Sequence, residues 1–409
     1  MKSIAIIGGG FAGLIAAITA AGQNPDCKIT IFERLDRCGK KILATGNGRC
    51  NLSNRQAGKL ENGRLLHYHG QAPSFANHAL AAHSIDDMID FFKQLSMPVR
   101  FEEEKLFPYS LTASTVLDVL RFTAASKGIR FCLSSPTSQI KLKNEKFIVD
   151  QQAFDRCVIA CGGKASPHLG SDGSGYCLLT QFGHQLSPLY PAITQIKTDN
   201  TLVKQVKGLK IDAVVSALEK NHLTRKEFGQ VLFTDYGLSG PPVLQLSAYV
   251  VKSPKNCMLS LDLAPDMPFH DLLSLLEQIC KSPCMRDMKT DMLLSTLFHK
   301  RLGQIILKST GFSLSTPVKN ITQADRKKIA AAIKDFRLQV TGVQGFSNAQ
   351  VTLGGILTKD FDDKTMESRL VPHLYAAGEI LDITGDCGGY NLQWAFSSGC
   401  LAGEHAAKD

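Results

Sequence analysis

The chain opens with an apolar run, a glycine cluster and an alanine-rich stretch, and an alternating run follows. Residues 3–7 (Ser-Ile-Ala-Ile-Ile) have the length and composition of a buried strand. Residues 14–18 (Leu-Ile-Ala-Ala-Ile) continue as a helix would, and residues 28–32 alternate polar and apolar side chains. This order predicts a strand, a tight turn, a helix and a second strand.

The pattern of polar and apolar residues changes near residue 186. Up to about residue 185 the pattern predicts long helices and a few strands, at 77–97 and 112–127 for the helices and at 129–132, 147–149 and 157–161 for the strands. From about 186 short alternating strands with Pro and Gly turns predict a small barrel or sandwich, with strands at 192–196, 211–215, 230–233 and 258–263. Residues 268–337 have a helical pattern.

Strand and helix patterns like those of the N-terminus return near the C-terminus. Residues 351–356 and 374–377 predict strands, and paired glycines at 388–389 precede a helical stretch. Since 409 residues exceed what one core usually covers, we expect more than one domain. The predicted class is α/β, with a Rossmann-like domain formed by residues 1–185 and 346–409. Residues 186–345 form an insert, with a β-barrel at about 186–265 and 310–345 and a helical part at about 268–337.

The glycine cluster has the spacing of a dinucleotide-binding turn. Gly8, Gly10 and Gly13 fit G-x-G-x-x-G, in which the first allows the turn, the second lets a pyrophosphate approach and the third lets helix pack on strand. Phe11 and Ala12 then lie at the helix N-terminus, where unpaired N–H groups favour a phosphate. Glu33 ends the second strand, at the place of an acid that binds ribose hydroxyls.

A polar, glycine-spaced loop follows, and it carries a family resemblance. Residues 39–51, G-K-K-I-L-A-T-G-N-G-R-C-N, resemble the signature of the BaiN/RdsA-type flavoproteins, which are FAD-dependent oxidoreductases. Residues 233–241 resemble the motif F-T-x-x-G-L-S-G-P of the same family, and residues 377–379 (A-G-E) with the following glycine pair resemble its closing FAD motif. The resemblance implies further FAD contacts from Arg34, Lys41, Asn47, Gly48, Arg49, Cys50, Asn51, Thr137, Gly162, Gly378, Glu379, Gly389, Asn391 and Leu392.

Two segments depart from known nucleotide-binding patterns. Residues 102–110 resemble the family segment E-x-G-R-x-F-P-x-S, but Glu104 and Lys105 stand where the family has Gly-Arg, so that arginine's role is not carried over. The turn at 170–176 is glycine-rich but lacks the Lys-Ser/Thr of a Walker A loop. No second glycine motif with its strand, helix and acid is recognisable, so we expect no dedicated NAD(P)H domain. NAD(P)H is still the expected electron donor.

Composition sets the class of protein and argues against metals. With 44% hydrophobic and 20% charged residues and no uninterrupted apolar run of ~18 residues, we expect a cytoplasmic globular protein without a membrane segment. Twelve scattered cysteines favour neither disulfides nor zinc. Four histidines in one region (His67, His69, His78 and His83) lack a pattern of accompanying carboxylates or cysteines, and we interpret them as surface or capping residues.

The positive charge is concentrated in the insert. Residues 186–345 contain 21 Lys and Arg against 13 Asp and Glu, so they carry +8 of the total charge of +9. Such asymmetry fits an RNA substrate, although a solvated surface is the alternative. One predicted helix holds five of these cations, Arg326, Lys327, Lys328, Lys334 and Arg337.

The resemblance implies reduction of a ring carbon–carbon double bond, in ribosomal RNA uridine or in a steroid-like metabolite, with amine oxidation as a third assignment. The flavin supplies the chemistry, which fits the lack of a triad or metal cluster. Cys50 and Cys387 are candidate proton donors, or small residues that fill tight glycine loops. A non-enzymatic flavoprotein, either a redox sensor or an RNA-binding factor, is the alternative class, and no protein partner is evident.

Overall fold

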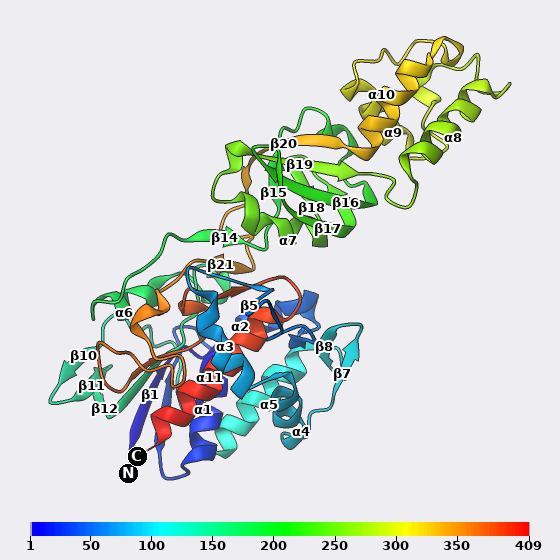
Figure 1. The fold of residues 1–409 in the computed structure, drawn as a ribbon. Helices are drawn as coiled ribbons and strands as arrows, with labels where there is room; N and C mark the ends of the chain where they lie inside the picture. Colours follow the sequence, from blue (N-terminus) through cyan, green and yellow to red (C-terminus); the bar gives the residue numbers. More distant parts are fainter. Residues whose placement is uncertain (1, 409) are drawn as a thin grey trace. The chain divides into compact units, whose positions relative to one another are not determined.

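The computed structural model describes residues 2–408 and divides into two compact units (Figure 1). One unit comprises Met1–Pro191 and Ala349–Asp409, and the other comprises Ala192–Asn348. Each unit has its own hydrophobic core. The unit limits lie a few residues beyond those expected from the sequence, because β14 (Tyr190–Ala192) pairs with β21 (Val351–Leu353) before the chain enters the second unit.

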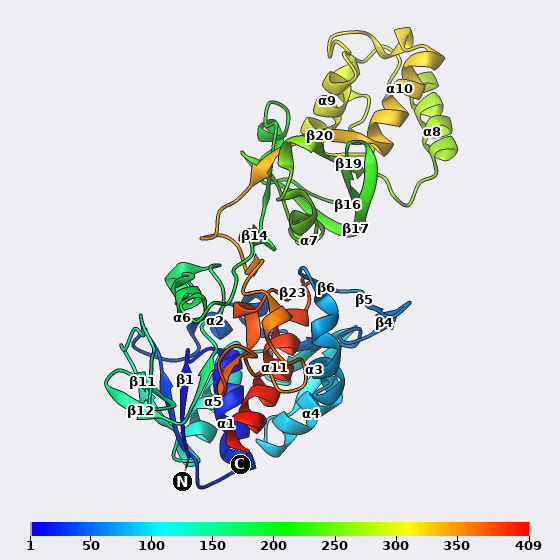
Figure 2. The same cartoon turned by 60° about the vertical axis from the view of Figure 1, so that its left-hand side comes forward.

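The first unit is built on a five-stranded parallel sheet in the order β22-β13-β1-β2-β9. Its strands are β1 (Ser3–Ile7), β2 (Lys28–Phe32), β9 (Arg130–Cys132), β13 (Arg156–Ile159) and β22 (Leu374–Ala376). The last strand comes from the C-terminal part of the chain, so both ends of the chain build one sheet, as predicted. An antiparallel sheet lies on one side of it and the helices α1 (Phe11–Gln23), α5 (Ala113–Ser126) and α11 (Tyr390–Ala407) on the other (Figure 2). That antiparallel sheet is formed by β10 (Lys141–Lys143), β11 (Lys146–Val149) and β12 (Gln152–Phe154).

Helices α1 and α11 pack at unusually close range because small residues line their contact. A Cβ atom on Gly399 would lie 2.8 Å from the carbonyl oxygen of Ala12, and one on Gly403 would lie 2.3 Å from that of Ala16. Any larger side chain would push the helices apart. The first and last helices of the unit are therefore fixed to each other, and with them the two glycine turns that precede them.

The remaining elements of the first unit are short. Helices α3 (Ala76–Ala82) and α4 (Ile85–Gln94) replace the single helix predicted at 77–97, because Ser84 caps α4 in a capping box with Asp87 and so starts a new helix. Strands β3 (Ser53–Asn54), β8 (Lys105–Pro108) and β7 (Val99–Glu102) form one sheet. Two small pairs complete the unit, β6 (Tyr68–His69) with β23 (Thr384–Gly385), and β4 (Leu60–Glu61) with β5 (Arg64–Leu65). Two short helices, α2 (Lys40–Leu43) and α6 (Cys177–Thr180), lie in the connecting loops.

The second unit contains a closed six-stranded barrel in the order β15-β18-β17-β16-β19-β20. Its strands are β15 (Ile196–Thr198), β16 (Lys210–Glu219), β17 (His222–Phe233), β18 (Gly237–Ser239), β19 (Cys257–Asp262) and β20 (Phe336–Val343). The strand predicted at 192–196 is wrong. The chain there leaves one sheet and joins another, and Ile193 takes a positive φ of 50° at the break.

Four helices accompany the barrel: α7 (Pro241–Val250), α8 (Phe269–Lys281), α9 (Lys300–Ser309) and α10 (Gln323–Lys334). The predicted second barrel segment at 310–345 is mostly wrong, since only β20 in that range is a barrel strand. Arg337 therefore lies in β20 rather than in a helix with the cations at 326–328, and its guanidinium pairs with Asp335 at 2.8 Å. Within the described chain, no helix is both long and apolar enough to cross a membrane.

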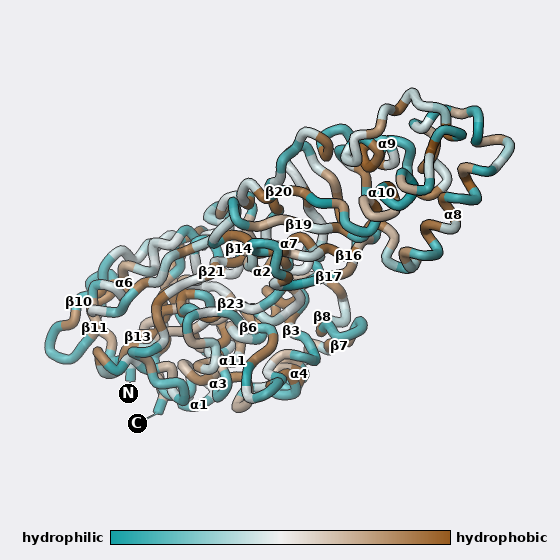
Figure 3. Tube along the Cα trace, turned by 45° about the horizontal axis from the view of Figure 1, so that its top comes forward, coloured by the Kyte–Doolittle hydropathy of each residue, from teal (hydrophilic) through white to brown (hydrophobic). Residues whose placement is uncertain are grey.

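Hydropathy follows this architecture (Figure 3). The trace is teal over the turn that joins β10 and β11, where residues 144–145 are exposed. Strand β19 alternates buried and half-buried residues, as expected of a barrel strand with one face in the core. Buried apolar residues thus lie on the strands and packed helices of each unit.

Candidate cofactor site

The first glycine turn has the geometry that its spacing predicts. Gly8 has a φ of +108°, and a Cβ there would lie 2.5 Å from the carbonyl oxygen of Ala160. A Cβ on Gly13 would lie 1.9 Å from the carbonyl oxygen of Gly8, so only glycine lets α1 pack on the turn. Gly10 is the N-cap of α1, no side chain caps this helix, and a Cβ on Gly10 would meet no atom within 4 Å. Open space therefore lies beside Gly10, directly before the first turn of α1, to which Phe11 and Ala12 belong.

Glu33 is buried at the end of β2, and both of its carboxylate oxygens bind backbone. Oε2 accepts the Gly9 N–H at 2.9 Å and Oε1 accepts the Leu35 N–H at 2.9 Å. Each carboxylate oxygen has a second lone-pair site, so ribose hydroxyls remain possible donors to it. The side chain thus holds the glycine turn against the second strand, a role that the sequence analysis did not include.

Arg34 connects the end of β2 to the glycine-rich turn at 170–176. Its Nη1 forms an ion pair with Asp172 Oδ2. Burial opposes ionisation of Asp172, but hydrogen bonds from Ser174 and Arg34 outweigh it and lower the pKa of this carboxyl. This turn is therefore part of the same site wall as the first glycine turn.

The loop from 39 to 51 has an unusual backbone. Gly46, Asn47, Gly48 and Cys50 all have positive φ values, of 55°, 55°, 84° and 58°. A run of left-handed residues turns successive N–H groups toward one side, as in anion-binding loops, and strained residues of this kind cluster at functional sites. A Cβ on Gly48 would meet no atom within 4 Å, so this loop also faces open space.

The side chain of Arg49, from the loop at 39–51, contacts the hairpin formed by β7 and β8. Its Nη2 is 2.5 Å from Glu102 Oε2, and its guanidinium carbon lies 4.6 Å from the centroid of the Phe107 ring. Arg100 donates to the other oxygen of Glu102 at 2.8 Å. This hairpin is the segment whose sequence departs from the family at Glu104 and Lys105, and its Glu102 carboxylate binds one arginine from the loop and one from β7.

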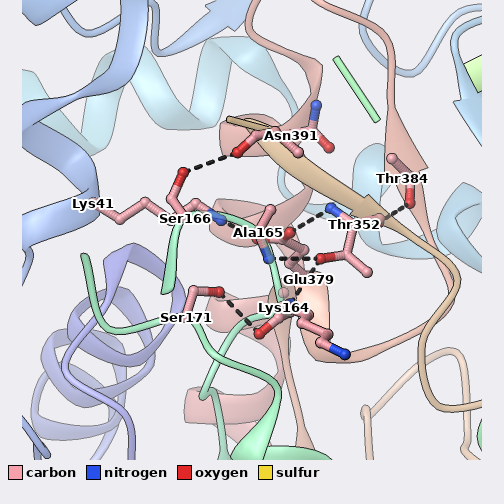
Figure 4. A network of polar contacts seen from close by, with 12 residues as sticks. Lys41, Lys164, Ala165, Ser166, Ser171, Thr352, Glu379, Thr384 and Asn391 are labelled. Atoms are coloured by element: carbon pink, nitrogen blue, oxygen red, sulfur yellow. Dashed lines mark hydrogen bonds and ion pairs between the residues drawn. The ribbon is translucent and has the colours of Figure 1, made fainter. Parts of the chain in front are cut away.

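A polar network connects the closing motif to the rest of the unit (Figure 4). Glu379 accepts the Lys41 ammonium at 2.8 Å and the Thr352 N–H at 2.8 Å, through its two different oxygens. The hydroxyl oxygen of Thr352 accepts the N–H groups of Lys164 at 2.7 Å and Ala165 at 3.0 Å. The loop at 39–51, the turn that follows β13, strand β21 and the closing motif are thus joined through the side chains of Glu379 and Thr352.

Gly162 and Thr137 were both predicted to contact the cofactor. Gly162 has a φ of +71° at the turn after β13, and a Cβ there would lie 3.1 Å from the hydroxyl of Ser171. The Thr137 hydroxyl is buried and has no hydrogen-bond partner among the described residues. A buried hydroxyl without a partner is costly, so this position fits a residue that would bond to a polar atom of a cofactor.

The closing motif places the N-terminus of α11 against the loop. Gly389 is the N-cap of α11 with a φ of +104°, and a Cβ there would lie 2.4 Å from the Ser53 carbonyl oxygen and 2.8 Å from Asn51 Oδ1. That amide oxygen is itself buried without a partner in the described chain. The side chain of Asn391 bonds both the N–H and the carbonyl of Gly385, each at 2.8 Å. The turn before the helix is therefore closed on itself.

Gly378 and Leu392 complete the predicted set. Gly378 has a φ of +77°, donates its N–H to Ser398 at 2.9 Å and accepts the Trp394 indole N–H at 3.1 Å, so it is fixed to α11. Leu392 is half-buried and packs against the core. The turn that follows β22 is thus joined to the last helix by two hydrogen bonds.

These features fit FAD. The open space at Gly10 and Gly48, the uncapped N-terminus of α1 and the unpaired buried oxygens of Asn51 and Thr137 are the places where phosphate, flavin and adenine atoms would find partners. When bound, flavin accepts and donates hydride. The residues that would hold it all belong to the first unit.

The two candidate cysteines differ in exposure. Cys50 is fully buried, and burial raises the pKa of its thiol to about 12, which makes it a poor proton donor near neutral pH. Cys387 is half-buried in the turn before α11. The interpretation of Cys50 as a small residue that fills a glycine loop agrees with its surroundings.

Two histidines and an aspartate form a cluster that the sequence analysis missed. His67 and His69, predicted as surface or capping residues, are only about one-fifth exposed, and both bind the buried carboxylate of Asp386. A His-x-His pair directs both side chains to one face of a strand, which was the available signal. Among residues 2–408 no group of three or more potential ligands could hold a metal ion.

Comparisons with known proteins agree with the interpretation of these residues as a cofactor site. The chain matches the family described as HI0933-like protein Rossmann domain over residues 2–405. A 3-dehydro-bile acid delta(4,6)-reductase from Clostridium scindens is 36% identical over 419 aligned positions that cover 100% of both chains. Ribosomal RNA dihydrouridine synthases from Haemophilus influenzae and Escherichia coli are 30% and 31% identical, with 96% of this chain and 95% of each relative covered. The chain therefore belongs to the HI0933-like family, and it is an FAD-dependent oxidoreductase.

Proposed function

We propose that the protein reduces a carbon–carbon double bond that is part of a ring and conjugated to a carbonyl group. The observation that carries this proposal is the 36% identity, over the full length of both chains, to a reductase named for a 3-dehydro-bile acid. Dihydrouridine, named in the other two relatives, is also the product of reducing a ring double bond beside a carbonyl. The substrate class shared by these names is a ring enone or its pyrimidine counterpart.

The first unit would supply binding and electrostatics for this reaction. The positive end of the α11 dipole, which begins after Gly389, would stabilise the negative charge that a reduced flavin carries. Lys41 is held by Glu379 at the same wall of the site, so its charge has a fixed place. Bound flavin supplies the hydride, and the chain's own residues fix its orientation.

We further propose NAD(P)H as the electron donor. The second unit is a closed barrel with helices, not a second parallel sheet with its own glycine turn. NAD(P)H would therefore reach the open face of the flavin directly.

Ribosomal RNA is a second candidate substrate, favoured by the charge of the inserted unit. Its 21 Lys and Arg against 13 Asp and Glu give +8, and lysine and arginine contacts to phosphates supply most nonspecific affinity for RNA. Lys327 and Lys328 are exposed on α10, and the nearby Asp325 carboxylate is engaged in capping that helix through Thr322. These two cations are therefore available to an anionic partner.

The structure narrows the set of cations predicted to act together. Lys334 pairs with Asp262 at 2.6 Å and donates to two backbone carbonyls, which gives it a structural role. Arg326 is half-buried and donates to the Ile321 carbonyl at 3.2 Å. Of the five cations, Lys327 and Lys328 therefore stay candidates for contact with RNA phosphates.

The experiment that tests the function separates two half-reactions. Purified yellow protein is mixed with NADPH or NADH without oxygen, and flavin absorbance is followed. Bleaching, followed by reoxidation with a 4,6-dien-3-one steroid, would support the small-molecule reading. Loss of dihydrouridine from ribosomal RNA in a deletion strain would support the RNA reading.

Two other outcomes would favour other functions. Bleaching by amines and not by NAD(P)H would favour an amine oxidase. Flavin that stays oxidised with every donor would favour a redox sensor or a flavin-containing RNA-binding factor.

A further inference from the structure

We propose that His67, held by Asp386, is the proton donor of the reduction. This inference rests on the proposed function, because saturating a carbon–carbon double bond requires a proton beside the hydride. The carrying observation is a cluster of two histidines on one buried carboxylate, next to the turn that begins α11. His67, His69 and Asp386 all lie outside the glycine motifs at 8–13 and 388–389.

The backbone fixes this cluster from two distant parts of the chain. Strand β6 pairs antiparallel with β23, with Thr384 opposite His69 and Gly385 opposite Tyr68. Asp386 follows β23 directly, and its N–H donates to the His67 carbonyl at 2.9 Å. The carboxylate and the imidazole thus face each other because of strand pairing, not because of a flexible loop.

The charge arrangement orients the imidazole. The Asp386 side chain is only 4% exposed, so its carboxylate needs hydrogen-bond or charge partners. Oδ2 lies 3.0 Å from His67 Nδ1, and Oδ1 lies 2.6 Å from His69 Nε2. A carboxylate on Nδ1 fixes that nitrogen as the N–H donor and leaves Nε2 as the position that gains and loses a proton.

His67 Nε2 makes no hydrogen bond to any of residues 2–408. The ring itself is about one-fifth exposed, so a proton from water can reach it. One face of the His67 ring stacks on the ring of Tyr390, with 4.5 Å between the ring centroids. Tyr390 is the first residue of α11, immediately after Gly389. The available nitrogen therefore belongs to a ring that contacts the helix start we assign to the flavin.

Two neighbouring ionisable side chains, those of Tyr68 and His69, do not take the role. Tyr68 is buried and donates its hydroxyl to the Tyr390 carbonyl at 3.1 Å. Burial holds the pKa of Tyr68 well above its usual value, so this phenol stays neutral and weakly acidic. His69 shares the carboxylate and acts as a positioning residue for it.

The reaction balances with this assignment. The substrate carbon–carbon double bond receives a hydride, which bound flavin supplies, at one carbon. The neighbouring carbon receives the proton from His67 Nε2, so a C–H bond forms as the N–H bond breaks. Neutral His67 then takes a proton from water, and NAD(P)H restores the two electrons.

The test compares two acceptors on reduced flavin. In the His67→Gln variant we expect wild-type FAD binding, wild-type bleaching by NADPH and wild-type reoxidation by ferricyanide, which needs no proton at carbon. Reoxidation by the ring substrate identified for the wild type should fall by roughly 10²- to 10⁴-fold, the usual contribution of general acid catalysis. His78→Gln, a histidine on α3, is the matched control and should leave both reoxidation rates unchanged.

A second measurement does not depend on turnover. In FAD-free protein, NMR of the histidine ring nitrogens should show a protected Nδ1–H on His67, and Asp386→Asn should remove it. Loss of the ring-substrate step in His67→Gln together with this signal supports the proposal. Full reoxidation in His67→Gln, or no protected Nδ1–H in the wild type, overturns it while the proposed function stands. A wild-type flavin that no ring substrate reoxidises overturns both.

Discussion

Replacing Gly10 by valine tests whether the open space at the first glycine turn is the pyrophosphate site. In the structure Gly10 has φ −77° and ψ −172°, an extended conformation that valine adopts readily. A Cβ at Gly10 would meet no atom within 4 Å. The substitution should therefore leave the FAD-free fold intact and place two methyl groups where the phosphates would bind.

The expected loss of FAD affinity can be estimated from the hydrogen bonds that valine would block. A hydrogen bond to a charged group contributes about 1.5–3 kcal/mol. Blocking the approach of phosphate to two N–H groups, those of Phe11 and Ala12, would remove about 3–6 kcal/mol. That corresponds to roughly a 10²- to 10⁴-fold weaker FAD complex. The free energy of unfolding of the FAD-free protein should change by less than about 1 kcal/mol.

The assay is a titration of FAD-free protein with FAD, followed by flavin fluorescence, beside a denaturant unfolding curve. Gly22→Val is the matched control, because Gly22 lies in the same helix and also faces open space. Gly13→Ala should behave in the opposite way and destabilise the fold itself, since its Cβ would overlap the Gly8 carbonyl at 1.9 Å. Wild-type FAD affinity in Gly10→Val would refute the assignment, and unfolding of that variant without FAD would refute the reading of the space as empty.

Four further predictions concern substitutions of one or two side chains. Glu33→Ala should weaken FAD by about 1.5–3 kcal/mol for each ribose hydrogen bond that it removes, and an unchanged dissociation constant in the FAD titration would place the ribose elsewhere. Cys50→Ala and Cys387→Ala should keep FAD, bleaching and turnover, and a selective loss of turnover in one would make that thiol the donor. Replacing the lysines at 327–328 by Gln should reduce the slope of log RNA affinity against log salt concentration by roughly 0.7–0.9 for each phosphate that is no longer bound. The same change at the lysines 141 and 143, on the other unit, is the control and should leave that slope unchanged. Asp155→Asn should lower the free energy of unfolding by about 2 kcal/mol at pH 7 and by almost nothing near pH 2, as measured by denaturant unfolding at both pH values.

The sign of the Asp155 prediction follows from its hydrogen bonds. Burial opposes ionisation, but hydrogen bonds from Ser3 and Lys146 outweigh it and lower the pKa of Asp155 to about 2, from an ordinary value of 3.8. A lowered pKa in the folded state means that the ionised form stabilises the fold above pH 3.8. That contribution falls away as the pH drops through about 2. Equal destabilisation by Asp155→Asn at both pH values would show that the effect is one of packing alone.

The first glycine turn was determined by the sequence alone. An apolar run, three glycines at fixed spacing and a helical stretch are local signals, and each constrains the backbone within a few residues. The structure gives Gly8 its positive φ and Gly13 its close approach to the Gly8 carbonyl, as the spacing required. The division into a parallel-sheet unit and an inserted unit was also readable, because the alternation of polar and apolar residues changes near residue 186.

Local patterns could not choose between a barrel and a sandwich, nor place the boundaries inside the helical segment. Short alternating strands are compatible with both folds, and only the pairing of β15 with β20, far apart in the chain, closes the barrel. The cap at Ser84 likewise divided a helix whose apolar pattern looked continuous. Competing local signals of similar strength make such boundaries uncertain until packing decides between them.

The histidine cluster shows most clearly what only tertiary structure decided. His67 and Asp386 are 319 positions apart, and nothing in the periodicity around either residue points to the other. They meet because β6 pairs with β23 in one register, and a shift of one residue would turn the side chains to the opposite face. The network at Glu379, which joins Lys41 to Thr352, depends on the same kind of long-range pairing. The sequence determined the glycine turn because its constraints are local, whereas the tertiary structure decided the histidine cluster because strand register depends on contacts across the whole chain.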